Sequence, residues 1–274
     1  MISMGNVWDR TAEFLSDNLG AVVPIALLAI FVPAVISGNF TDLQQGASAG
    51  LRMGLSIAGL ILALVSFWGQ LSITALALDP SLGLSATRIG TRRLPAALLV
   101  MVVVVLCALL LAVPFGVLLA VAGVDLSNIG SGTMPAIPVA ARLWVAAYLL
   151  LLVPLVLWLA ARLSVLVPAV VGEGKSLGAI GESWRLTRGV ALRIVGVLIL
   201  YVIVSSVASL AATTAFGAVA RLAVGSGEDG LSLATVLTAV VSGAVGTAFT
   251  VLATAFAAKL FVALRARDEA TAAR

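Results

Sequence analysis

The residues able to do chemistry are few in this chain, and one of them stands out by its position. Arg162 lies near the end of a long apolar stretch, where a charged side chain is costly and is therefore a functional candidate. The structural alternative, which we favour, is that its long stem reaches the lipid headgroups or that it binds carbonyls freed by Pro168. Glu173 is its natural partner, although Pro168 between them should bend the helix.

Catalysis by the common side-chain constellations is not supported by the sequence. The chain has no histidine, which removes the commonest general base and metal ligand. It has no phosphate-binding loop, no cluster of metal-ligand residues and no serine–histidine–aspartate set. The sequence therefore predicts a protein that is not an enzyme and that uses no cofactor and no metal.

Other polar side chains lie within apolar stretches and have two interpretations. Gln70 is predicted to make an interhelical hydrogen bond rather than to bind a substrate. Small and hydroxylated residues recur at every fourth position in two later stretches, which lets helix backbones approach closely while hydroxyls bond across the contact. These predicted packing residues are Ser205, Ser209, Thr213 and Gly217, and then Ser242, Gly246, Thr250 and Thr254. A polar permeation path is the alternative interpretation.

The elements that must position these residues are membrane-spanning helices. Of 274 residues, 62% are hydrophobic and 10% are charged, against roughly 45–50% and about 25% in soluble domains. A spanning helix needs about 20 apolar residues, and the alternating strands of an outer-membrane barrel are not seen. The sequence thus predicts an all-α integral membrane protein with six transmembrane helices. The predicted spans are 20–37, 52–78, 95–123, 140–170, 191–223 and 231–264.

The positions of lysine and arginine predict the orientation of these spans. Segments on the side of the N-terminus hold twelve of the sixteen cationic residues and the opposite side holds three, so both termini are expected in the cytoplasm. Nucleic acid is not an expected partner, because no basic stretch is interleaved with aromatic residues. Fourteen arginines against two lysines indicate a GC-rich genome, which favours the inner membrane of a bacterium.

Short amphipathic segments precede each pair of spans. Polar side chains at helical spacing form a stripe in residues 6–17, 81–92 and 175–185, and each stripe predicts a helix lying flat at the membrane surface. The chain is therefore expected to be one membrane domain of three repeats, 1–78, 79–170 and 171–274. Each repeat would combine an interfacial helix with a transmembrane hairpin, and all three interfacial helices would face the cytoplasm.

Residues 162–193 resemble a bacterial membrane family. The segment runs from Arg162 through Pro168 to Glu173 and continues with the run Ser-Trp-Arg-Leu-Thr-Arg-Gly at 183–189. It is similar to the membrane domain attached to some glycerophosphodiester phosphodiesterases, which also occurs alone in six-span proteins. The resemblance implies the membrane part without the enzyme, because that activity belongs to a separate barrel domain that uses histidines. It adds Trp184, Arg185 and Arg188 to the candidate residues and implies no substrate.

Two functions are expected from these observations. The first is a non-enzymatic inner-membrane protein that binds or organises membrane lipids or partner proteins through its cytoplasmic amphipathic face. The alternative is a transporter or channel subunit for a lipid or small apolar molecule, although intramembrane charges, which coupled carriers commonly need, are scarce. A continuous cavity lined by Arg162, Gln70 and the hydroxyl faces would favour transport, whereas a close-packed bundle with no cavity would favour the organising role. The small-residue face of the last span could serve a homo-oligomer or a membrane-protein partner as well as an internal contact.

Overall fold

The computed structural model describes residues 3–44, 47–121, 138–219 and 233–272, and this part of the chain is all-helical. Within it, six helical stretches are long and apolar enough to cross a membrane. These stretches are Leu19–Gly38, Ala49–Leu78, Pro80–Val121, Ala141–Glu173, Ala191–Val219 and Val236–Ala272. The predictions of an all-α fold and of six spans are confirmed at this level. The predicted ends at 123, 223 and 231 lie outside the described residues.

The helices of the described ranges follow one another along the chain. In chain order they are α1 (Met4–Asp17), α2 (Leu19–Ala26), η1 (Leu27–Phe31), α3 (Val32–Gly38), α4 (Phe40–Gln44), α5 (Ala49–Leu78), η2 (Pro80–Ser85), α6 (Ala86–Val121), α7 (Val139–Leu163), α8 (Leu166–Glu173), α9 (Gly178–Leu186), α10 (Ala191–Ala211), η4 (Ala212–Phe216) and α12 (Leu233–Ala272). The amphipathic helices α1 and α9 occur where the sequence predicts helices. Each buries one face, with Val7 and Phe14 in α1 and Ala179 and Leu186 in α9.

A proline makes the first span irregular. Pro33 has no N–H, so it cannot donate to the carbonyl of Ala29 as a helix requires. The backbone accommodates this in η1, a wider π turn in which the N–H of Val32 donates to a carbonyl five residues earlier. Helix α5 approaches this turn closely, because a Cβ added at Gly69 would lie only 2.6 Å from the Cβ of Ala29.

The fourth predicted span, 140–170, is not one helix. Helix α7 ends at Leu163 and α8 begins at Leu166, because Pro168 cannot donate to the carbonyl of residue 164 and its ring crowds that carbonyl. Helix α8 ends at Gly174, which has a φ of +71°, in the left-handed region that glycine adopts without strain. The proline therefore turns the end of the span in a new direction.

The second predicted surface helix, at 81–92, is also different. Residues 80–85 form the 3₁₀ turn η2, in which Gly83 has a φ of +51°. The side chain of Asp79 caps the turn by accepting from the N–H of Ser81 at 3.1 Å. Arg88 and Arg92 belong to the first turns of the continuous helix α6. A separate amphipathic helix does not form here, because Pro80 and the positive φ of Gly83 make a turn that leads directly into the span.

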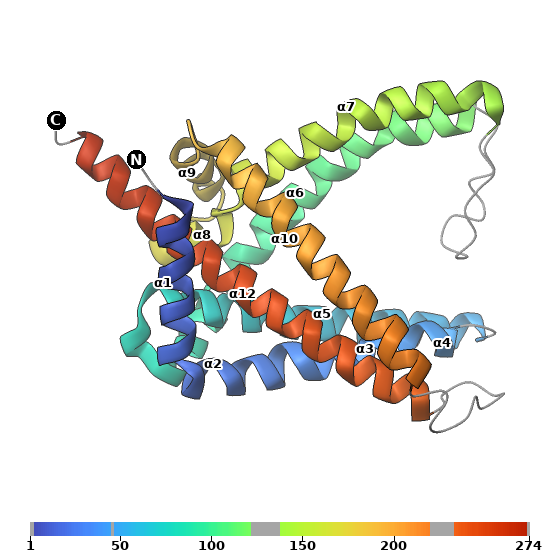
Figure 1. Ribbon diagram of the computed structural model, residues 1–274, viewed down its shortest axis with the longest axis horizontal. Coiled ribbons are helices and arrows are strands. Elements are labelled where there is room, and N and C mark those ends of the chain that lie inside the picture. Colours follow the sequence, from blue (N-terminus) through green and yellow to red (C-terminus); the bar gives the residue numbers. More distant parts are fainter. Residues whose placement is uncertain (1–2, 45–46, 122–137, 220–232, 273–274) are drawn as a thin grey trace.

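Two groups of helices diverge from a shared end of the molecule (Figure 1). Helices α6 and α7 run together toward the upper right of the view, while α3, α5, α10 and α12 converge toward the lower right. Helices α1, α8 and α9, the η2 turn and the last turns of α12 gather at the opposite end, on the left. We call this shared end the base.

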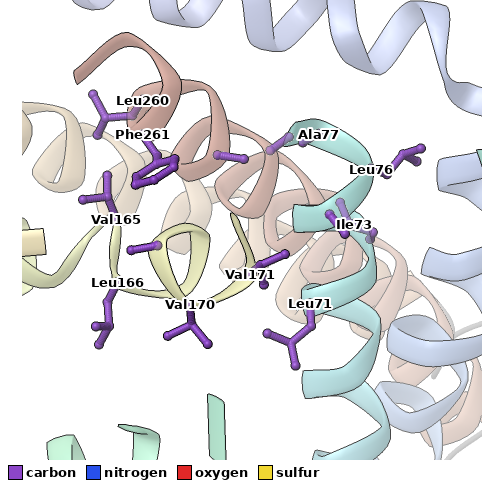
Figure 2. Close-up of a cluster of buried hydrophobic side chains, with 14 of the residues drawn as sticks. Leu71, Ile73, Leu76, Ala77, Val165, Leu166, Val170, Val171, Leu260 and Phe261 are labelled. Carbon is purple, nitrogen blue, oxygen red and sulfur yellow. The ribbon is translucent and has the colours of Figure 1, made fainter. Parts of the chain in front are cut away.

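The core of tightly packed side chains lies at the base. It is formed mainly by the end of α5, by α8 and by the second half of α12 (Figure 2). Its members include Leu71, Ile73, Leu76, Val165, Val170, Leu260 and Phe261, all at most 3% exposed. Farther out, α6 and α7 expose large apolar side chains, such as Leu110 at 71% and Leu151 at 76%. In water such surfaces would be unfavourable, whereas lipid tails are as apolar as leucine.

Candidate functional site

Arg162, in the last turn of α7, lies between two tryptophan rings. Its guanidinium carbon is 5.1 Å from the ring centroid of Trp158 and 5.1 Å from that of Trp184. The two rings meet edge to face with their centroids 5.1 Å apart, and Nη1 of Arg162 donates to the carbonyl of Trp184 at 3.0 Å. We call these three residues the aromatic clamp. The clamp holds the cation at the junction of α7 and α9 by cation–π contacts and a hydrogen bond.

The backbone of Arg162 completes the docking of α9 on α7. Its carbonyl accepts from the hydroxyl of Ser183 at 2.6 Å, while the hydroxyl of Thr187 donates to the carbonyl of Ser183 at 2.8 Å. Carbonyls in the last turn of a helix lack a partner within it, so the fully buried Ser183 supplies a missing donor. The sequence analysis assigned no role to either side chain.

Glu173 does not pair with Arg162. Its carboxylate lies 2.7 Å from Nζ of Lys175 and 3.3 Å from Nη1 of Arg265. The bend at Pro168 is the physical reason, because it directs the end of α8 toward the last turns of α12. The ion pair anticipated from the sequence is therefore not formed.

Four further charges extend this contact. Glu182 pairs with Arg185 at 2.7 Å, and Arg185 lies 3.4 Å from Asp268. Arg265 also pairs with Glu269 at 3.2 Å. The hydrogen bond with Glu182, followed by attraction to Glu182 and Asp268, raises the pKa of Arg185 above its ordinary value. We call Glu173, Lys175, Glu182, Arg185, Arg265, Asp268 and Glu269 the charged cluster, which lines a cleft of about 440 Å³.

Two more cations cap helix ends at the base. Nη2 of Arg267 donates to the carbonyls of Leu186 and Arg188 at 2.9 and 3.4 Å, while Arg188 itself is exposed. Nζ of Lys259 donates to the carbonyl of Ala77 at 2.8 Å. These carbonyls lie at the ends of α9 and α5, where helical partners are missing and cations are favoured. Helix α12 is thereby fastened to both neighbours.

The hydroxyls of the predicted packing stripes bond along their own helices. Ser205 and Thr213 of the fifth span donate to carbonyls three and four residues earlier, at 3.2 and 3.0 Å. Thr250 of α12 donates four residues earlier at 2.8 Å. Ser209 and Thr213 are exposed. The expected hydrogen bonds across a helix contact are therefore not formed by these residues.

Close backbone approach occurs at other glycines. A Cβ added at Gly243 would lie 2.9 Å from Val35, and one added at Gly90 would collide with Ser72. Gly246, by contrast, faces open space, and Gly217 has only an ordinary contact at 3.5 Å. The buried hydroxyl of Ser242 has no hydrogen-bond partner within the described chain.

A cavity of about 760 Å³ lies between α1, α5, α10 and α12, beside the junction of α7 and α8. Its lining is overwhelmingly apolar and includes Trp8, Leu198, Leu252 and Phe256. The volume falls within the range of about 300–1,000 Å³ that small-molecule sites occupy. Arg162 does not line this cavity.

Gln70 is the distinctive polar residue of the lining. The hydroxyls of Thr74, Thr254 and Tyr201 donate to backbone carbonyls at 2.8, 2.8 and 3.2 Å, and that of Ser164 does so at 2.8 Å. The carboxamide of Gln70 makes no hydrogen bond to any residue that the structure describes. Its predicted interhelical hydrogen bond is therefore not formed, and the amide is available to a ligand.

The helices and the cavity define a multi-pass, all-helical membrane protein with an apolar internal site. Across the described ranges, no group of three or more histidine, cysteine or acidic residues is placed to hold a metal. Comparison with known protein families, with characterised proteins and with solved structures finds nothing that matches this chain. Its function is therefore argued from the cavity, the clamp and the charged cluster.

Proposed function

We propose that this chain is a non-enzymatic protein of a bacterial inner membrane that binds a membrane lipid in the cavity between α1, α10 and α12. The observation that carries the proposal is the cavity, with its volume of about 760 Å³ and its apolar lining. Water in such a space would lack the two to four polar partners it needs. Hydrocarbon from the surrounding bilayer fills it instead.

The place of α1 supports a lipid as the occupant. This amphipathic helix buries Val7, Thr11 and Phe14 against the base, and its Trp8 is 48% exposed while also lining the cavity. Tryptophan is enriched at the level of the lipid headgroups, where one part of the ring is wet and the rest is apolar. The cavity therefore begins at the membrane surface and continues into the hydrocarbon.

The proposal includes the predicted topology. Helices α1 and α9 lie at the base together with the η2 turn, which replaces the second predicted interfacial helix. Their common position supports three repeats of 1–78, 79–170 and 171–274 with cytoplasmic termini. The base also holds the cations of the charged cluster, which agrees with the excess of positive charge assigned to the cytoplasm. The proposal also includes the kinship with the phosphodiesterase membrane domain, which rests on the resemblance of residues 162–193.

Binding is favoured over transport by the position of Arg162. A cavity containing Arg162, Gln70 and the hydroxyl faces was the expected mark of a transport path. Gln70 and Thr254 line the cavity, but Arg162 is engaged by Trp158 and Trp184 outside it. The cation is therefore absent from the one internal site to which the proposal assigns a ligand.

Native mass spectrometry of the purified full-length chain tests this function. The wild-type protein is expected to retain lipid after gentle removal of the detergent. The Ala253→Phe variant places a ring in the cavity and should lose this adduct, whereas Ala248→Phe, at an exposed position on the same helix, should keep it. A wild-type protein without lipid, or two variants with equal retention, would contradict the proposal.

A further inference from the structure

We infer that the ligand of this cavity is an uncharged lipid whose hydrogen-bonding group, a carbonyl or a hydroxyl, lies deep in the membrane and binds the carboxamide of Gln70. The inference rests on the proposed function, since it names the class of lipid that the same cavity takes. Three observations carry it. They are the lack of charge in the lining, the free amide, and the depth of that amide along α5.

The lining excludes a charged group from the cavity. No aspartate, glutamate, lysine or arginine is among the residues that line it. A charge buried among apolar side chains without a partner is strongly unfavourable. A phosphate or carboxylate headgroup would therefore remain outside, and whatever enters the cavity is neutral.

The free amide selects for one polar group on that neutral ligand. A carboxamide has two N–H donors and one carbonyl acceptor, and leaving them unbonded in an apolar space is costly. The hydroxyls of Thr74, Thr254 and Tyr201 have each donated their proton to the backbone. Besides the indole N–H of Trp8, which the proposal places at the membrane surface, Gln70 is thus the side chain of the lining that still has protons to donate. A ligand carbonyl would accept from its N–H groups, and a ligand hydroxyl would both donate and accept.

The depth of Gln70 separates classes of lipid. Gln70 lies eight residues before the end of α5 at Leu78, which places it about 12 Å along the helix axis. The proposal places the membrane boundary at the end of α5, where Asp79 follows the helix and Lys259 binds the carbonyl of Ala77. Half of the hydrocarbon layer is about 15 Å thick, so Gln70 lies nearer to the middle of the bilayer than to its surface.

This depth disfavours an ordinary phospholipid. The ester carbonyls of a phospholipid are held next to its charged headgroup at the membrane boundary. They could reach Gln70 only if the charge moved about 12 Å into the hydrocarbon. A diacylglycerol, a long-chain alcohol or a quinone has a polar group with no charge attached, and this group can sink to the level of Gln70 at little cost.

A competition experiment tests the inference. Full-length protein in detergent is mixed with equal amounts of diacylglycerol and phosphatidylglycerol carrying the same acyl chains, and bound lipid is counted by native mass spectrometry. The wild-type protein should retain mainly diacylglycerol. Gln70→Leu should weaken this retention about three- to tenfold, the effect of one hydrogen bond. Ser56→Ala is the matched control, because it removes a hydroxyl from the same helix that is already bonded to the backbone and that lies outside the cavity lining.

The outcomes separate the inference from the proposed function. If the wild-type protein retains neither lipid, the proposed function fails. If it retains phosphatidylglycerol as well as diacylglycerol or better, the lipid-binding function stands and the inference of an uncharged ligand is overturned. If Gln70→Leu and Ser56→Ala behave alike, the role of Gln70 is overturned. Repeating the competition with a long-chain alcohol and with a quinone ranks the uncharged lipids. Stronger retention of any of them than of phosphatidylglycerol supports the inference.

A measurement on the wild-type protein avoids dependence on a variant that could fail to fold. A quinone lipid without hydroxyl groups, labelled with ¹³C at its two ring carbonyls, is bound to the protein, and the carbonyl stretch is recorded by infrared spectroscopy. A hydrogen bond from Gln70 should lower the frequency of one carbonyl relative to the same lipid in a hydrocarbon solvent. Bound lipid whose carbonyls all absorb as in hydrocarbon would refute the contact with Gln70.

Discussion

Replacing Arg162 by methionine tests whether the aromatic clamp stabilises the fold or serves function directly. Methionine keeps the length and the apolar stem but removes the cation and its donors. Two cation–π contacts of about 0.5–1 kcal/mol each at a partly exposed site would be lost, together with a charge-assisted hydrogen bond to the carbonyl of Trp184 worth about 1.5–3 kcal/mol. Packing of the new side chain on the rings of Trp158 and Trp184 offsets part of this loss, at about 0.3–1.5 kcal/mol for a sulfur–aromatic contact. The expected cost is therefore about 3 kcal/mol.

The assay is equilibrium unfolding in mixed detergent and dodecyl sulfate, followed by far-ultraviolet circular dichroism. Arg188→Met is the matched control, because Arg188 is exposed and its carbonyl rather than its side chain makes the contact with Arg267. This control substitution should change the free energy of unfolding by less than about 0.5 kcal/mol. In a double-mutant cycle, Arg162→Met and Trp184→Leu should be less than additive because they remove the same contact. A stable Arg162→Met protein with altered lipid retention would refute the structural role and make Arg162 a functional residue.

Two further changes test the backbone contacts by the same unfolding assay. Gly174→Ala should destabilise the protein by about 1–2 kcal/mol, since a left-handed residue gains a Cβ, and the new Cβ would also collide with the guanidinium of Arg93. Gly181→Ala, at an exposed helical position with open space, should be neutral or slightly stabilising. Equal changes in stability at the two sites would contradict this explanation. Gly243→Leu should cost about 1–3 kcal/mol of stability by overpacking, whereas Gly246→Leu should be tolerated. A larger loss of stability at Gly246 than at Gly243 would show that the small-residue stripe predicted from the sequence forms the helix contact.

The fold class could be predicted from the sequence because membrane insertion is a local property. The hydropathy of one stretch decides whether it spans, and the predicted span 52–78 differs from α5 by only three residues at its start. Packing is not local in this way. Gly243 and Gly246 look alike in the sequence, but only Gly243 lies close to a neighbouring helix.

The candidate site could be predicted only in part, because its contacts join segments that lie apart in the sequence. Arg162 was identified by its type and place, and Glu173 was proposed as its partner from proximity along the chain. The bend at Pro168 separates them, and the true contacts come from Ser183 and Trp184, about twenty residues further on. Trp158 could have been found, because residues four apart share a helix face. The cavity could not, since its walls come from helices far apart in the chain.

Helix α12 contributes residues to both the cavity and the charged cluster. Its 40 residues extend about 60 Å, twice the hydrocarbon thickness. Between Ala253 in the cavity wall and Arg265 in the charged cluster it contains no proline and no glycine, so this stretch of about 18 Å has no flexible point. A lipid bound in the proposed site that displaced Ala253 would therefore also move Arg265 relative to Glu173. On the proposed function, occupancy of the cavity would in this way strain the ion pairs of the charged cluster.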